Sequence, residues 1–176
     1  DAAGGLVANA PHIPVHLGAM SATVRAVRAR FPDLREGDAI ATNDPAEGGS
    51  HLPGVTVVSP VFVGAELQFF VASRGHQADI GGMAPGSMPA DSRTLEEEGV
   101  VIRAFPLVRA GVFDEARLRA LLTGARFPAR TPDDNVADLE AMVAANHAGA
   151  RLLAEYVAEE GAEMLAALMS ALQAAG

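Results

Sequence analysis

Two histidines and two aspartates form the part of the sequence best suited to chemistry. Asp44 and His51 lie in one glycine-rich segment, and His76 and Asp79 lie in a second one. Glycine lets the backbone approach a ligand closely. Imidazole and carboxylate groups are ligands for Zn, Mn or Fe, and a histidine can also move a proton near neutral pH. The residue types predict a metal or acid–base site of His51, His76 and Asp79, with Asp44 nearby.

An apolar hairpin pattern joins the two segments. The runs Val55–Phe62 and Leu67–Ala72 are separated by a Gly64-Ala65 turn, and Pro60 predicts an edge position or a bend. If the runs pair as antiparallel strands, the flanking segments lie at the same end of the hairpin. The four side chains would then converge. The alternative is that they only form hydrogen bonds within glycine-rich turns.

Three further histidines have less specific surroundings. His12 and His16 are four residues apart, but Pro14 lies between them and favours an extended backbone, in which both rings share one face. They are either ligands or hydrogen-bonded residues at a strand end. His147 falls in a predicted helix, where a packing or surface role is expected.

The elements that must position these residues predict an α+β fold. Strands and loops come first and helices last, which favours a mixed or antiparallel sheet with glycine-rich site loops, followed by a C-terminal helical segment. We expect a β-rich domain over residues 1–130 and a helical segment packed on it over residues 131–176, together one domain and a fragment of a longer chain. Strands are expected over residues 6–10, 39–42, 55–62, 67–72, 100–102 and 105–108, and helices over residues 21–31, 113–122 and from 133 onward with a break at Gly161.

Composition narrows the partners. The chain has 176 residues, enough for one sizeable core, and a formal net charge of -9. That charge argues against nucleic acid or an anionic membrane as a partner. The chain contains no cysteine, so neither a disulfide nor a thiolate metal site is possible. The sequence contains no glycine-rich motif for binding the phosphates of a nucleotide. We expect a cytoplasmic protein.

A set of motifs resembles the hydantoinase B/oxoprolinase family. The resemblance runs in order along nearly the whole chain and covers the N-terminal part of larger family members. Its motifs are Leu6-Val7-Ala8, Pro11-His12-Ile13-Pro14-Val15-His16-Leu17-Gly18, Asn43-Asp44-Pro45, Gly48-Gly49-Ser50-His51-Leu52-Pro53, Pro60-Val61-Phe62, Arg74-Gly75-His76, Ala78-Asp79-Ile80-Gly81-Gly82, Pro85-Gly86-Ser87-Met88-Pro89 and Glu98-Gly99-Val100.

The resemblance implies an ATP-dependent enzyme that works with a second subunit. A hydantoinase A-type partner would use ATP and Mg to phosphorylate a substrate oxygen, and the B-type chain would complete the opening of a cyclic amide, either a hydantoin or 5-oxoproline. The chain would act in a hetero-oligomer and be inactive as an isolated fragment. Two alternative functions stay open. The chain is either a subunit of an ATP-dependent ketone carboxylase or a degenerate, non-catalytic domain that only docks a partner.

The resemblance also bears on the metal. In the carboxylase branch it implies a manganese site built from the histidine and aspartate of a His-Leu-Pro-Asp segment and the histidine of Arg-Gly-His. His51 and His76 match these positions, but Gly54 stands in place of the aspartate. The loss removes a ligand and a negative charge. Asp79 or Asp44 would have to substitute, or the site is weak or empty.

Overall fold

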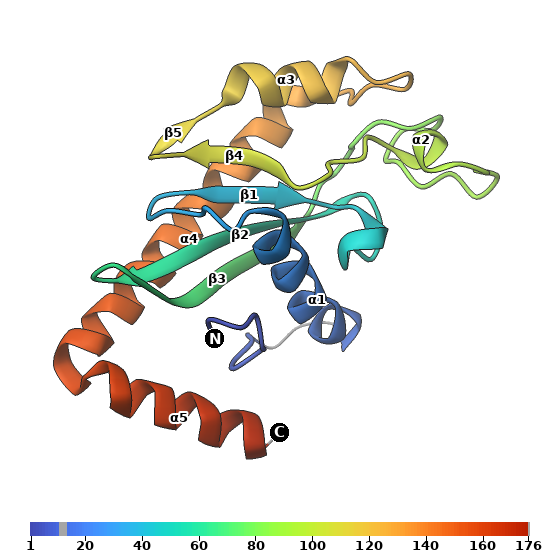
Figure 1. Cartoon of the computed structure of the whole chain (residues 1–176). Helices are drawn as coiled ribbons and strands as arrows, with labels where there is room; N and C mark the ends of the chain where they lie inside the picture. The colour runs from blue at the N-terminus through green and yellow to red at the C-terminus, as the bar shows by residue number, and fades with distance from the viewer. Residues whose placement is uncertain (11–13, 176) are drawn as a thin grey trace.

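The computed structural model describes residues 1–10 and 14–175, without the side chains of residues 14–17 and 175 (Figure 1). Its elements are α1 (Pro14–Arg30), β1 (Ala39–Thr42), η1 (Pro45–Glu47), β2 (Gly54–Val63), β3 (Glu66–His76), α2 (Leu95–Glu98), β4 (Phe105–Arg109), β5 (Val112–Phe113), α3 (Glu115–Thr123), α4 (Pro132–Glu160) and α5 (Ala162–Ala175). The expected α+β class is confirmed. His12 lies outside the described residues.

The sheet in the described residues is antiparallel, with the strand order β3-β2-β1-β4-β5. The β2–β3 hairpin forms as expected, and its register pairs Gly54 with His76. The two glycine-rich segments therefore leave the hairpin at the same end. β1 pairs with β2 only opposite residues 56–58, so Pro60 lies beyond the end of β1. The N–H that proline lacks is therefore not needed for a hydrogen bond to β1.

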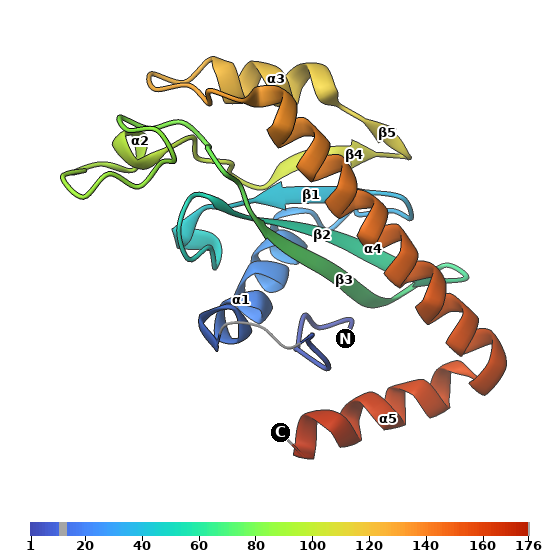
Figure 2. The ribbon, with the colours of Figure 1, turned by 180° about the vertical axis from the view of Figure 1, so that it is seen from behind.

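One helix covers each face of the sheet. α1 packs on one face through Val24 and Val27, which join a cluster with Val58 of β2 (Figure 1). α4 crosses the other face, where Leu139 is fully buried against a cluster that includes Leu107 of β4 (Figure 2). Full burial of one such side chain contributes about 1.5–3 kcal/mol. Packing on both faces therefore holds the site-bearing hairpin rigidly.

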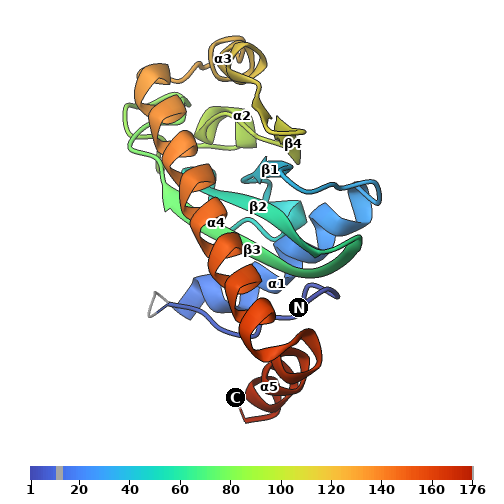
Figure 3. The ribbon, with the colours of Figure 1, turned by 90° about the vertical axis from the view of Figure 1, so that its left-hand side faces the viewer.

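The C-terminal helices are packed on one face and exposed on the other. In the second half of α4, Leu153 and Val157 pack in a cluster with Leu165 of α5, whereas Leu152 and Tyr156 are exposed. Gly161, with φ of 87°, separates α4 from α5, which confirms the expected break. α5 turns away from α4 (Figure 3). It buries Leu165 and exposes one stripe, which consists of Met164, Leu168 and Leu172.

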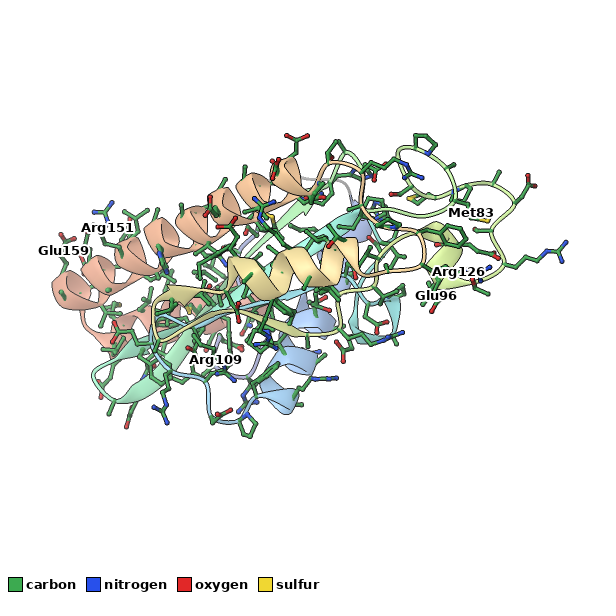
Figure 4. All side chains as sticks on the ribbon, turned by 90° about the horizontal axis from the view of Figure 1, so that it is seen from above. Met83, Glu96, Arg109, Arg126, Arg151 and Glu159 are labelled. Carbon is green, nitrogen blue, oxygen red and sulfur yellow. The ribbon has the colours of Figure 1, made fainter. Side chains whose placement is uncertain are left out.

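Charged side chains lie on the outer surface of α4. Arg151 and Glu159 project from α4 away from the sheet (Figure 4). Arg151 forms an ion pair with Glu155 one turn later along the helix. Exposed pairs of this kind contribute only about 0.3–0.5 kcal/mol, so this surface is not what attaches α4 to the sheet.

Three expectations about local structure are wrong. Residues 6–10 form no strand, because Leu6 N donates to the Ser21 hydroxyl instead of to a neighbouring strand. α1 begins at Pro14 and not near Ser21, so residue 16 is helical instead of extended. Proline fits the first helical position, where its missing N–H needs no partner. Residues 100–102 form no strand, since Asn43 bonds to Ile102 through its side chain as well as its backbone.

Among the described residues, no helix is both long and apolar enough to cross a membrane.

Candidate functional site

The structure brings two of the predicted site residues together. His76 ends β3, and His51 lies in the loop that leads into β2, so the hairpin register sets both residues at the same end of the hairpin. The centroids of their imidazole rings are 5.0 Å apart, with the ring planes tilted by 43°. His51 is half-buried and His76 is exposed. The two imidazoles form a pair that water and a ligand can reach.

Gly54 lies beside the His51 ring. A Cβ atom added to Gly54 would be 3.1 Å from His51 Cε1, and Gly54 is the register partner of His76. The His51 ring is also within hydrogen-bonding distance of the Ser50 hydroxyl, with 2.8 Å between Nδ1 and Oγ. A carboxylate carried by residue 54 would therefore point toward the histidine pair. The glycine leaves this position without one.

A buried asparagine holds the loop that carries His51, a role that the sequence reasoning missed. Asn43 is fully buried, and its amide nitrogen donates to the carbonyls of Leu52 at 2.7 Å and Val100 at 2.9 Å. Its carbonyl oxygen accepts the N–H of Ile102 at 2.6 Å. One side chain thus ties both ends of residues 43–52 to the segment before β4. The only sequence signal is its place at the end of an apolar strand.

Asp79 is held by its own loop and by an arginine. Its Oδ1 accepts the backbone N–H groups of Gly81 and Arg130, and its Oδ2 accepts the N–H of Gly86 and the Arg130 guanidinium at 2.9 Å. Burial alone would raise the pKa of the Asp79 carboxyl, but these hydrogen bonds outweigh burial and hold the pKa below its usual value. Asp79 therefore connects residues 79–86 to Arg130, just before α4, through hydrogen bonds. We call this structural role a staple.

The neighbouring side chains reinforce this staple. Arg130 also donates to the carbonyl of Gly82 at 2.7 Å. The Ser87 hydroxyl donates to the carbonyl of Gly81 at 2.6 Å and accepts the N–H of Ile80. The glycine-rich loop after β3 is thus held together by hydrogen bonds of its own side chains and of Arg130.

Asp44 caps a short helix. Its Oδ1 accepts the N–H of Ala46 at 2.9 Å, and its Oδ2 is 3.2 Å from Arg103 Nε. Asp44 is buried and precedes Pro45, the first residue of η1. These contacts match the alternative role expected from the sequence, in which Asp44 forms hydrogen bonds within a turn and is not a ligand.

Only two of the four predicted metal ligands lie together in the described residues. No group of three or more His, Cys, Asp or Glu side chains within them is placed to hold a metal ion. His51 and His76 are together, whereas Asp79 and Asp44 are engaged with arginines and backbone amides. The structure therefore provides two imidazoles, and a third ligand would have to come from elsewhere. His147 lies far along α4 and is exposed.

The chain belongs to the hydantoinase B/oxoprolinase family, whose family model matches residues 1–176. It is 49% identical to 5-oxoprolinase 1 of Arabidopsis thaliana over 179 residues, which cover 97% of this chain and 14% of that relative. It is 35% identical to the caprolactamase subunit beta of Pseudomonas jessenii over 162 residues, which cover 92% of this chain and 27% of the relative.

Two solved structures share the fold. The crystal structure of the ATP-dependent caprolactamase from Pseudomonas jessenii matches with a TM-score of 0.80 and 34% identity, covering 91% of this chain and 27% of that one. A nucleotide-free acetone carboxylase matches with a TM-score of 0.72 and 23% identity, covering 91% of this chain and 21% of that one. The second likeness shows the fold alone. The chain spans between about one seventh and one quarter of these relatives.

Proposed function

We propose that this chain forms the histidine-bearing part of an ATP-dependent cyclic-amide hydrolase. The observation that carries the proposal is the family match over all 176 residues, with 49% identity to a 5-oxoprolinase. Its relatives are named for the hydrolysis of two lactams, 5-oxoproline and caprolactam. The substrate class is therefore a small cyclic amide.

The histidine pair supplies groups that such a reaction needs. Opening a cyclic amide places negative charge on the carbonyl oxygen and requires proton transfer to the leaving nitrogen. His51 and His76, with 5.0 Å between ring centroids, can donate to that oxygen from two sides or move a proton. The role of Asp79 as a catalytic residue also stays a proposal, but its four hydrogen bonds favour a structural one.

A partner subunit would supply the phosphoryl group. We propose a hydantoinase A-type subunit that binds ATP and Mg and activates the substrate oxygen, in a hetero-oligomer with this chain. The name of the caprolactamase subunit beta supports a multi-subunit assembly, and the solved caprolactamase is described as ATP-dependent. A cytoplasmic location remains a prediction.

Metal binding is a separate proposal. A divalent Mn, Zn or Fe ion would take His51 and His76 as its ligands from this chain. A third ligand would come from another group, because Gly54 has no side chain to supply one. When bound, such an ion would polarise the amide carbonyl as a Lewis acid. Elemental analysis of the purified chain, beside a His51→Ala/His76→Ala variant, tests this. Stoichiometric metal that the variant loses supports it, and an equal metal content in both contradicts it.

A chimera tests the catalytic role. Residues 1–176 would replace the matching 27% of the caprolactamase subunit beta, which has the same fold at a TM-score of 0.80. We expect His51→Ala or His76→Ala in the chimera to lower ATP-dependent caprolactam hydrolysis at least a hundredfold. His147→Ala, on the exposed side of α4, is the matched control. Near-parental turnover in both site variants would remove the histidines from the mechanism.

The non-catalytic alternative rests on one observation. Gly54 places no carboxylate beside the histidine pair, as expected of a degenerate domain that only docks a partner. The chimera separates the two functions, because a docking domain would assemble with the partner yet show no turnover. A ketone carboxylase function has only the shared fold in its favour. Replacing caprolactam by acetone and bicarbonate in the same assay tests that function.

A further inference from the structure

Arg74 links the strand that ends in His76 to β2 and α1. It lies on β3 two residues before His76, so both side chains are on the same face of the sheet. Its register partner on β2 is Thr56, and Arg74 Nε donates to the Thr56 hydroxyl at 2.6 Å. A terminal guanidinium nitrogen donates to the hydroxyl of Thr23 in α1 at 3.0 Å. The guanidinium thus joins β2, β3 and α1 on one side of the sheet.

The same nitrogen reaches the loop that carries His51. It donates to the carbonyl of Gly48 at 3.2 Å, and the Thr23 hydroxyl lies 2.9 Å from that carbonyl. Gly48 has φ of 86° and ends η1, three residues before His51. A Cβ atom there would lie 2.5 Å from the Thr23 backbone nitrogen, so the loop is packed directly on α1. Arg74 therefore contacts the base of the loop from the strand that ends in His76.

We propose that Arg74 is a positioning residue that holds the loop bearing His51 at a fixed distance from His76. Its importance for turnover rests on the function proposed above for the histidine pair. A planar guanidinium binds several oxygens in fixed directions, whereas the lysine ammonium is a single point donor on a flexible stem. Lysine at position 74 would keep the charge but would not bridge Thr56, Thr23 and Gly48 together.

Partial burial strengthens these contacts. Thr23 and Thr56 are almost fully buried, and burial lowers the pKa of the Arg74 guanidinium. An arginine stays charged at neutral pH even so. Hydrogen bonds made away from water are stronger than exposed ones, and broken ones leave buried hydroxyls unsatisfied. Loss of the guanidinium should therefore loosen the loop base before it disturbs the sheet.

Nuclear magnetic resonance on the isotope-labelled 176-residue chain tests this without any substrate. The readouts are the NOE between the ring protons of His51 and His76 and the hydrogen-exchange rates of amides 49–51. We expect Arg74→Met and Arg74→Lys to lose the inter-ring NOE and to raise those rates at least tenfold, with the cross-strand NOEs of the β2–β3 hairpin retained. Arg151→Met, on the outer face of α4 (Figure 4), should behave as wild type.

The outcomes separate the possible roles. If Arg74→Lys keeps the NOE and the exchange rates, a positive charge suffices and the bridging role is wrong. If Arg74→Met fails to fold, Thr56→Val removes the acceptor of Arg74 Nε on β2 with little change in shape and should raise the exchange rates about threefold; no change would overturn the proposal. The NMR experiment measures the position of the two histidine rings and not the turnover of a substrate. Separated rings in a chimera that still hydrolyses caprolactam would refute the proposed function and leave this inference intact.

Discussion

Removing the Asp79 carboxylate decides whether this residue is a structural staple or part of the reactive site. Asp79 is 6% exposed and accepts four hydrogen bonds, two from the backbone amides of Gly81 and Gly86 and two from Arg130. In Asp79→Ala the Gly81 amide stays buried without a partner, which costs about 1–3 kcal/mol. Gly86 and Arg130 are exposed enough for water to replace most of their contacts. We expect a total loss of about 3 kcal/mol.

Urea unfolding at pH 7 measures this loss as a shift in the midpoint, with Asp91→Ala in the same exposed loop as the control. The pKa of Asp79 in the folded chain is lowered. Its stabilising contribution is therefore present above the unfolded pKa of about 3.9 and is lost as pH falls toward the folded value. The difference in unfolding free energy between Asp79→Asn and wild type should shrink below about pH 4. A loss under about 1 kcal/mol, together with loss of bound metal, would refute the staple and make Asp79 a ligand.

Three further changes have defined outcomes. Gly54→Asp adds a carboxylate beside His51, and residue 54 lies outside the left-handed φ region, so the backbone accepts a side chain there. We expect this variant to bind Mn²⁺ or Zn²⁺ at least tenfold more tightly, as measured by calorimetry. An equal gain in affinity in Gly54→Asn would contradict a ligand role for the carboxylate. Leu139→Ala opens a cavity under α4 and should lower the unfolding free energy by about 2–5 kcal/mol, while Leu168→Ser on the exposed stripe of α5 should change it by less than about 0.5 kcal/mol in the same urea assay. Asn43→Ala leaves the Ile102 amide and two carbonyls without their partner and should cost about 2–4 kcal/mol; a cost below about 1 kcal/mol would show that the loop is held by other contacts.

Local patterns in the sequence were enough for the main elements. Alternating and β-branched runs around Gly64 predicted the β2–β3 hairpin, and its two-residue turn fixed the end at which His51 and His76 meet. The helix expected over residues 113–122 forms as α3, with Asp114 as its N-cap and Gly124 after its last residue, and both are local signals. The break at Gly161 followed from the same reasoning. These features depend on residues close together in the chain, which is why the sequence could predict them.

The start of α1 illustrates a weaker local signal. Pro14 between two histidines predicts an extended backbone, but proline is equally suited to the first turn of a helix, and the two cases differ only in what lies around the residue. Residues 6–10 are likewise apolar enough for a strand, yet the backbone of Leu6 forms hydrogen bonds with the side chains of Ser21 and Gln173 instead. Tertiary neighbours overrode local preference in both cases.

The chemistry of the carboxylates was decided by the tertiary structure alone. Sequence spacing grouped Asp79 with His51 and His76, but Arg130, 51 positions further along the chain, turns Asp79 into a staple. Arg103 does the same for Asp44 from 59 positions away. Residue types determined that two imidazoles and two carboxylates were available near one hairpin. Which of them face one another depended on distant partners, because a buried carboxylate takes the orientation in which all its hydrogen bonds are satisfied.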